Sequence, residues 1–180
     1  MTTPEKEQFT LIPQHVAIIM DGNRRWAEQR GLPSITGHQA GVKSLRAVIE
    51  RLGIYRVPVV TIYGFSTENW KRSRSEVQGL LFLLEEVLRK EIDEIHDKGI
   101  KLQHIGRLEE LPPSAQDIIN DSVSRTNNNV NMRLNFAFNY GGRLEIIDAF
   151  NRIIKNGAIS HPIDEKFFAG YYCEFPACWH

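Results

Sequence analysis

The chain has 180 residues, of which 42% are hydrophobic and 24% charged, so we expect one domain with a packed core. Its formal net charge of zero argues against a polybasic protein that coats nucleic acid or a membrane surface. Residues 1–14 form a short polar segment unlike a signal peptide, and no apolar run is long enough to cross a bilayer. We therefore expect a cytoplasmic protein, in which Cys173 and Cys178 stay reduced.

Short apolar runs alternate with longer amphipathic segments along the chain. The apolar runs predict strands at residues 15–20, 57–65, 100–105 and 131–139. Apolar residues at helical spacing predict helices at residues 41–52, 75–98, 113–126 and 142–155, with Gly99 as the stop of the longest one. This alternation predicts an α/β fold with a mainly parallel central sheet and helices on both faces.

The longest predicted helix carries a run of consecutive large apolar residues: Leu80, Leu81, Phe82, Leu83 and Leu84. At about 100° per residue the run covers the whole circumference of the helix, which a single buried stripe does not explain. One interpretation encloses the helix between the sheet and its neighbours, or places it at a dimer interface. In the other interpretation, one side of the helix lines an apolar cavity for a long hydrocarbon.

A first polar cluster follows the strand at residues 15–20 and reads Asp21-Gly22-Asn23-Arg24-Arg25-Trp26. Ligands of open α/β sheets bind at the carboxyl ends of the strands, where this cluster lies. Gly22 lets the backbone approach a ligand, and a helix start flanked by Arg24 and Arg25 can hold a phosphate. Asp21 beside that phosphate can hold Mg²⁺. The simpler interpretation of an Asp-Gly pair after a strand is a turn.

A second polar cluster follows the strand at residues 57–65 and reads Ser66-Thr67-Glu68-Asn69-Trp70-Lys71-Arg72. The simpler interpretation is a polar loop in which Ser73 caps the next helix. However, two such clusters end two strands that we expect to be neighbours. Together they predict a diphosphate site, with an apolar slot beside the long helix for the rest of the substrate.

Four segments, HVAIIMDGNRRW, GHQAG, YGFSTENWKR and FNYGGRLEI, occur in the order of the signatures of a known family. Over roughly residues 13–168 the chain resembles the cis-prenyltransferases of the undecaprenyl diphosphate synthase type. The resemblance implies prenyl transfer, in which isopentenyl diphosphate is condensed onto an allylic diphosphate with new cis double bonds. It also implies Mg²⁺ as the cofactor, an apolar tunnel for the prenyl chain, a homodimer, and peripheral membrane contact through the lipid product.

The resemblance also implies roles for individual residues. Asp21 would bind Mg²⁺ on the allylic diphosphate, and Asn69 matches the family's proposed proton acceptor. Because a neutral amide is a poor base, we expect Asn69 to relay the proton to diphosphate or water. The other residues expected to bind or line the substrate site are Gly22, Asn23, Arg24, Arg25, Trp26, His38, Ser66, Thr67, Glu68, Trp70 and Arg72, while Arg143 is within possible reach of it.

Two departures from the family pattern stand out. Ser34 occupies a substrate-binding position where the family usually has Arg, which removes one charge-assisted phosphate contact. After Phe168 the chain reads AGYYCEFPACWH, and nothing matches the family's RTSGE-type and R-x-S-N-F segment, which supplies arginines for isopentenyl diphosphate. We therefore divide the chain into residues 1–14, an incomplete catalytic domain at 15–168 that lacks the family's C-terminal strand and helix elements, and a divergent tail at 169–180.

This second departure leaves an alternative function open. If the chain is truncated, it is expected to retain the allylic half of the site and to condense weakly or not at all. It would then be a catalytically inactive protein that binds lipid diphosphates, or a truncated gene product.

Overall fold

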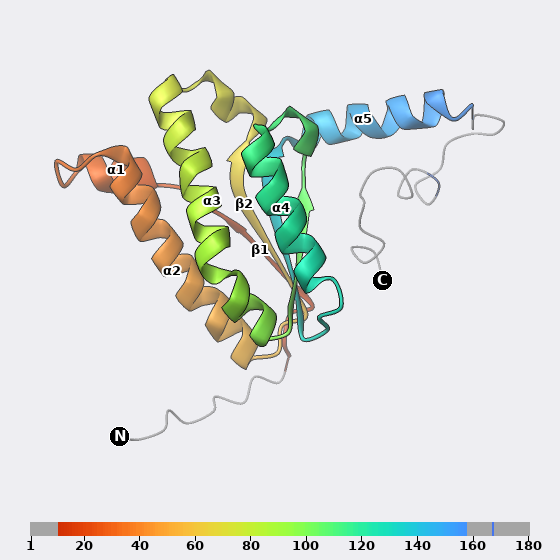
Figure 1. The fold of residues 1–180 in the computed structure, drawn as a ribbon, viewed down its shortest axis with the longest axis horizontal. Helices are drawn as coiled ribbons and strands as arrows, with labels where there is room; N and C mark the ends of the chain where they lie inside the picture. The colour runs from red at the N-terminus through yellow and green to blue at the C-terminus, as the bar shows by residue number, and fades with distance from the viewer. Residues whose placement is uncertain (1–10, 158–166, 168–180) are drawn as a thin grey trace.

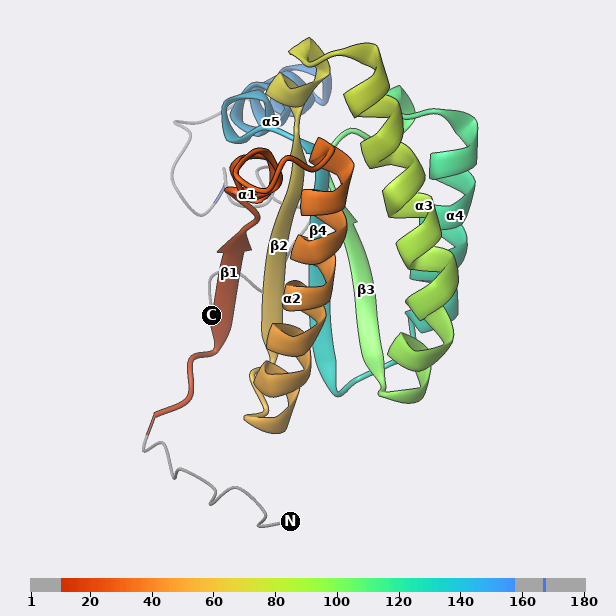
Figure 2. The ribbon, with the colours of Figure 1, turned by 90° about the vertical axis from the view of Figure 1, so that its left-hand side faces the viewer.

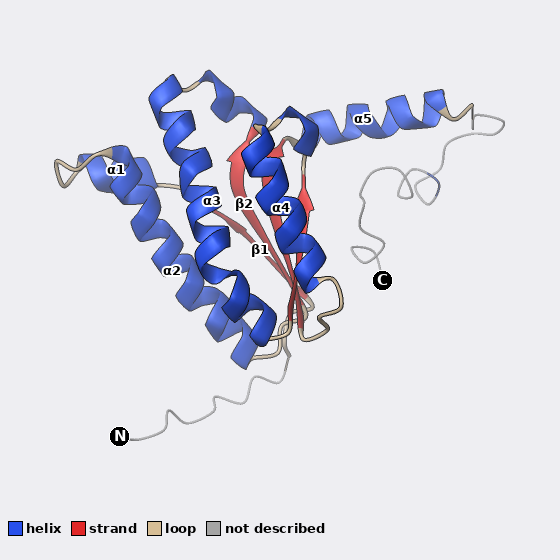
Figure 3. Cartoon of the chain, in the orientation of Figure 1, coloured by secondary structure: helices blue, strands red, loops and turns tan. Residues whose placement is uncertain are grey.

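The computed structural model describes residues 11–157 and residue 167. Its strands are β1 (His15–Ile19), β2 (Val59–Ser66), β3 (Ile100–Ile105) and β4 (Met132–Tyr140). Its helices are α1 (Asn23–Glu28), α2 (Ser34–Ile54), α3 (Arg74–Asp97), α4 (Pro113–Thr126) and α5 (Gly142–Lys155), with the short 3₁₀ helices η1 (Thr67–Lys71) and η2 (Leu108–Glu110). Each predicted strand and helix is present (Figure 3). The predicted tail at residues 169–180, with Cys173 and Cys178, lies outside the described residues.

The four strands form one parallel sheet in the order β1-β2-β4-β3. This confirms the α/β class and the parallel sheet. Helices α2 and α3 lie over one face of the sheet, and α4 lies beside α3 along the edge strand β3 (Figures 1 and 2). Helix α5 leaves the carboxyl edge of the sheet and runs away from it (Figure 1). In the described part of the chain, the predicted helical layer therefore covers one face rather than both.

The two faces of the sheet differ in chemistry. Side chains such as Val60, Leu102 and Leu134 are buried toward α2 and α3 in the main core. The opposite face carries a polar row in which Thr61 Oγ1 hydrogen-bonds His15 Nε2 at 2.8 Å and accepts from Asn135 Nδ2 at 3.0 Å. Burial of apolar surface is the main force that docks a helix on a sheet, so the apolar face receives the helices.

The apolar run in α3 is explained by neighbours on several sides. Leu80, Leu81 and Leu83 are buried and Leu84 is half-buried, because α3 lies between α2 and α4 and over the sheet (Figure 1). This confirms the interpretation of an enclosed helix for four of the five residues. Phe82 is the exception, since 69% of its surface is exposed.

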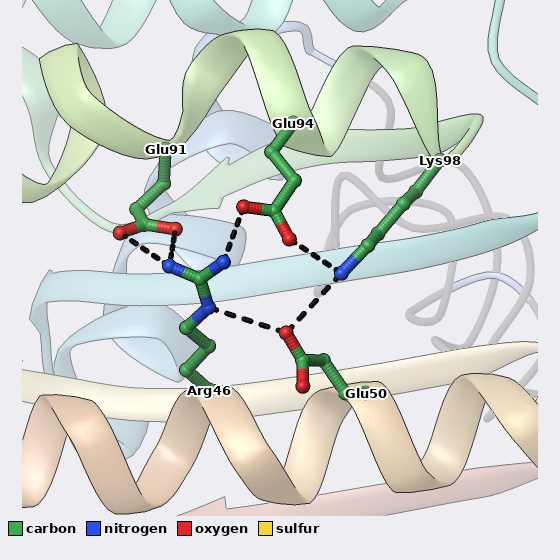
Figure 4. Close-up of polar contacts among 5 residues, drawn as sticks. All are labelled: Arg46, Glu50, Glu91, Glu94 and Lys98. Carbon is green, nitrogen blue, oxygen red and sulfur yellow. Dashed lines mark hydrogen bonds and ion pairs between the residues drawn. The ribbon is translucent and has the colours of Figure 1, made fainter.

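A cluster of charged side chains joins α2 to α3, and we call it the α2–α3 charge network (Figure 4). Arg46 on α2 donates to Glu91 at 2.8 Å and also pairs with Glu94, both on α3. Lys98 bonds Glu94 at 2.6 Å and Glu50 on α2 at 3.2 Å. Because each cation bridges two or more carboxylates, the network resists separation of the two helices better than isolated surface pairs do.

Helix α2 begins at Ser34, seven residues before the predicted start at residue 41. The segment between these positions contains Gly37 and His38 and lacks an apolar repeat, so local periodicity does not reveal it. Pro33 stands at the N-cap and supplies no side-chain hydrogen bond, so the usual sequence signal of a helix start is also missing. None of the helices in the described part of the chain combines the length and the apolar character that crossing a lipid bilayer requires.

Candidate active site

The two predicted polar loops leave neighbouring strands at the same edge of the sheet (Figure 2). Strands β1 and β2 are parallel and paired, with Ile19 opposite Tyr63. The pairing continues past β1, because Met20 N donates to Tyr63 O at 3.3 Å. Asp21 and its successors therefore emerge beside the end of β2, which leads directly into η1. This is the edge at which ligands of parallel sheets bind.

The first loop combines one exposed carboxylate with two arginines. Gly22 has a φ of +83°, a conformation that favours glycine, and its N–H donates to Asp21 Oδ1 at 2.6 Å. Arg25 lies 3.4 Å from the other Asp21 oxygen. Arg24 bonds Glu28 at 2.7 Å, and this hydrogen bond raises the pKa of Arg24. Because α1 has only six residues, its N-terminus would contribute little to the binding of an anion.

Helix α1 rests directly on the first turns of α2 through two glycines. A Cβ atom added at Gly37 would lie 2.0 Å from the backbone oxygen of Asn23, and one at Gly41 would lie 2.5 Å from Asn23 Oδ1. Gly37 therefore needs a residue without a side chain, whereas at Gly41 the obstacle is a side-chain amide that can rotate. This contact gives a structural reason for the two glycines of the GHQAG segment, which sequence reasoning had treated only as a family signature.

His38 lies between those two glycines along the chain and is half-buried. Its Nε2 atom is buried and has no hydrogen-bond partner among the described residues. Burial is the main cause that lowers the pKa of His38, nearby Arg72 lowers it further, and Glu76 opposes the shift. A buried nitrogen without a partner is costly, so His38 favours a ligand or water at this position.

The second loop is held in shape by its own hydrogen bonds. Ser66 Oγ accepts from Glu68 N at 3.1 Å, and Ser66 N donates to Asn69 Oδ1 at 3.0 Å. This reciprocal cap places the amide oxygen of Asn69 on the backbone of its own loop. The amide oxygen that the predicted proton relay through Asn69 would use therefore also accepts from the backbone of its own loop. Sequence reasoning missed this cap, although its signal is the Ser-x-x-Asn spacing.

The remaining predicted residues are placed around these two loops. Arg72 bonds Glu76 at 2.9 Å, and this pair is partly buried. Glu68 lies 3.6 Å from Arg143, and both of these side chains are exposed. A Cβ atom at Gly141 would lie 2.6 Å from Thr67 Oγ1, so the start of α5 closely approaches η1. Ser34 is the first residue of α2, and Trp26 on α1 stacks against the guanidinium of Arg30 at 4.3 Å.

A separate pocket of about 150 Å³ lies between the ends of β3 and β4 and helix α5. Thr67 is the one predicted site residue that lines it, beside Arg107, Asn139 and Tyr140. Sequence reasoning assigned no role to Arg107 and used the segment around Asn139 only as a family signature. Of these two residues, Asn139 bonds directly to the second loop, because its Oδ1 accepts from Trp70 Nε1 at 2.7 Å. Arg107 instead bonds Asn139, Glu110 and Asp148.

Mg²⁺ is compatible with the donors at this edge. No group of three His, Cys, Asp or Glu side chains suited to a metal ion occurs within residues 11–157 and at residue 167. Mg²⁺ does not require such a group, since it binds one or two carboxylates together with phosphate oxygens and water. Asp21, exposed and flanked by Arg25, fits that pattern.

Comparison with known proteins identifies the family of the chain. A family model described as "Putative undecaprenyl diphosphate synthase" matches residues 19–176. The isoprenyl transferase of Heliobacterium mobile is 46% identical over 164 residues, which are 89% of this chain and 63% of that protein. The isoprenyl transferase of Clostridium perfringens is 42% identical over 175 residues, or 93% of this chain and 69% of that protein. The chain thus spans about two thirds of the length of these relatives.

Solved structures share the fold. Lavandulyl diphosphate synthase from Lavandula x intermedia, in complex with dimethylallyl diphosphate, superposes with a TM-score of 0.83 at 34% identity and covers 89% of this chain and 70% of that one. A probable undecaprenyl diphosphate synthase from Campylobacter jejuni gives a TM-score of 0.73 at 26% identity, with 91% and 70% covered. The chain belongs to the undecaprenyl diphosphate synthase family of isoprenyl transferases.

Proposed function

We propose that this chain binds an allylic diphosphate such as farnesyl diphosphate at the carboxyl edge of β1 and β2 and takes part in cis-prenyl transfer from it to isopentenyl diphosphate. The observation that supports this proposal is the convergence of the two polar loops at one edge of a parallel sheet. The relatives named above are isoprenyl transferases, and one structural neighbour binds dimethylallyl diphosphate.

The reaction needs a site that stabilises departing negative charge. The allylic C–O bond breaks, its electron pair leaves with the diphosphate, and the double bond of isopentenyl diphosphate forms the new C–C bond. Arg24 and Arg25 would exchange their present carboxylate partners for diphosphate oxygens, with His38 Nε2 as a further contact. Asp21 would hold Mg²⁺, which would supply Lewis-acid stabilisation of the leaving group.

The last step is the loss of a proton, which quenches the cationic carbon skeleton. Asn69, whose oxygen accepts from Ser66 N, would orient the loop and relay the proton to the released diphosphate or to water. Water must otherwise be kept from the cationic centre.

An apolar space for the prenyl chain would lie between β1 and α2. Val16 and Ile18 on β1 and Leu45 and Ile49 on α2 pack against the main core but are only partly buried. Apolar side chains that face one another and keep solvent access suit an apolar ligand.

The same reasoning extends the proposal to assembly and location. Helix α5 exposes Ile146, Ile147, Phe150 and Ile154. Such an apolar helix face suits a second copy of the chain and supports a homodimer. We also propose a cytoplasmic enzyme that contacts the membrane peripherally through its lipid product.

Calorimetry with farnesyl thiodiphosphate, a substrate analogue that reacts slowly, tests the proposal in Mg²⁺ and in EDTA. We expect Mg²⁺-dependent binding that weakens about tenfold or more in Asp21→Asn, because one charged contact is lost. The matched control Asp117→Asn removes an exposed carboxylate on α4 and should bind normally.

Incorporation of labelled isopentenyl diphosphate then separates an enzyme from the alternative. Binding without product formation would support a lipid-diphosphate-binding protein. Equal affinity in Mg²⁺ and EDTA, or in Asp21→Asn and the wild type, would contradict the proposed site.

A further inference from the structure

Asn139, the penultimate residue of β4, is fully buried and has a φ of +54°. Its side-chain Nδ2 donates to Arg107 O at 2.9 Å and to Glu110 Oε2 at 3.0 Å. Its Oδ1 accepts from Trp70 Nε1 at 2.7 Å. Both amide hydrogens and the oxygen are therefore used, and a flipped amide would oppose the indole N–H with a second donor. The orientation of this side chain is fully determined.

The acceptors for Asn139 are held in place by the end of β3. Gly106 has a φ of +127°, and a Cβ atom there would lie 2.3 Å from Phe138 O, so β3 and β4 approach closely. Arg107 N donates to Asn139 O at 3.1 Å. The Arg107 guanidinium bonds Glu110 at 2.8 Å and both oxygens of Asp148 on α5, at 2.7 and 2.9 Å. A bidentate ion pair of this kind fixes the orientation of the guanidinium in addition to its electrostatic attraction.

Trp70 connects Asn139 to the second polar loop. Its ring meets Phe65 edge to face at 5.3 Å, and Phe65 stacks on Phe138 at 4.9 Å. Trp70 directly follows Asn69, whose Oδ1 accepts from Ser66 N. The loop is thus held at its start by its own cap and at its end by an indole anchored on β4.

We propose that Asn139 is a positioning residue for the diphosphate site, because its bond to Trp70 Nε1 holds η1 in the conformation that presents Ser66–Asn69 at the edge of β1 and β2. This inference rests on the proposed function of that edge. Asn139 itself acts only through Trp70. The bond joins residues 69 positions apart, so it couples the loop to the end of β4 rather than to its own neighbours.

The test uses two variants that remove the same bond from opposite sides. Asn139→Gly tolerates the positive φ and loses the side chain, so it adds no backbone strain. Trp70→Phe keeps the aromatic contact and loses the N–H. Each should weaken Mg²⁺-dependent binding of farnesyl thiodiphosphate about five- to tenfold. The affinity of the double variant should be less than about twofold below that of the single variant that binds more weakly. The two losses do not multiply, since both substitutions act through one bond.

A second readout does not depend on ligand binding. In a Trp26→Phe, Trp179→Phe background, Trp70 is the remaining tryptophan. Asn139→Gly should make its fluorescence more accessible to acrylamide, with a quenching constant raised about twofold as the indole loses its anchor. The control Asn129→Gly removes a side-chain bond to Ile100 O of 2.8 Å at the other end of the sheet and should change neither readout.

An unchanged quenching constant in Asn139→Gly, or losses that multiply in the double variant, would overturn the inference. If Asn139→Gly does not fold, Trp70→Phe decides the question alone, and normal binding by that variant would count against us. If the wild type does not bind the analogue, the proposed function fails, while the quenching comparison still decides whether Asn139 holds Trp70.

Discussion

Replacing Gly37 with alanine tests whether the α1–α2 contact positions the diphosphate site. The added Cβ atom would lie 2.0 Å from Asn23 O, whereas ordinary contacts begin at 3.4 Å, so the backbone of α1 must move by about 1.4 Å. The atom that blocks it belongs to the backbone and has no side-chain rotation by which to move away. Since Asn23 directly precedes Arg24 and Arg25, the displacement is passed to the arginines.

A shift of this size exceeds the tolerance of a charged hydrogen bond. Losing one arginine–phosphate contact costs about 1.5–3 kcal/mol, so affinity for farnesyl thiodiphosphate in Mg²⁺ should fall about 10- to 100-fold. Overpacking should also cost about 1–3 kcal/mol of stability, against a gain of about 1 kcal/mol because alanine favours a helix. Titration calorimetry and thermal unfolding measure the two effects.

Two other glycines of α2 provide graded controls. A Cβ atom at Gly53 would meet Met132 Cε at 3.7 Å, an ordinary contact, so Gly53→Ala should bind normally and be as stable as the wild type or more so. At Gly41 the obstacle is the side-chain amide of Asn23, which can rotate, so Gly41→Ala should have a smaller effect than Gly37→Ala. Normal affinity and unchanged stability in Gly37→Ala would refute the reasoning.

Two further predictions concern charge. Burial, with Arg72 nearby, lowers the pKa of His38 below its usual value, so in mild acid the unfolded chain binds a proton that the folded chain resists. Stability should therefore fall as the pH decreases below about 6.5. In thermal unfolding, His38→Asn should show a weaker dependence of the unfolding temperature on pH. Parallel curves of unfolding temperature against pH for the two proteins would contradict this prediction. The hydrogen bond from Arg46 lowers the pKa of Glu50, so this pair stabilises the fold at neutral pH and loses its effect as the pH falls through that lowered pKa. Arg46→Gln should lower the unfolding temperature at pH 7 in low salt, and the difference should shrink in high salt or acid; a difference independent of both would argue against the α2–α3 charge network.

Much of the framework is predictable from local sequence. The strand at residues 100–105 and the helices at residues 113–126 and 142–155 have the predicted bounds, because apolar periodicity and flanking proline or glycine are local signals. Gly99, with a φ of +67°, ends the longest helix as predicted. The expectation of neighbouring parallel strands was enough to place the two polar loops at one edge, because parallel strands end on the same side of a sheet.

The sequence by itself determined the four strands, most of each of the four longer helices, the parallel α/β class and the polar residues that follow β1 and β2. Only the tertiary structure decided that the described helices cover one face, that Gly37 meets the backbone of Asn23, and that Asn139 holds Trp70. The physical reason is range: strand and helix preferences arise between residues a few positions apart, whereas these contacts join segments that meet only after the chain has folded. The local sequence around a glycine or an asparagine does not indicate which distant group that residue will contact.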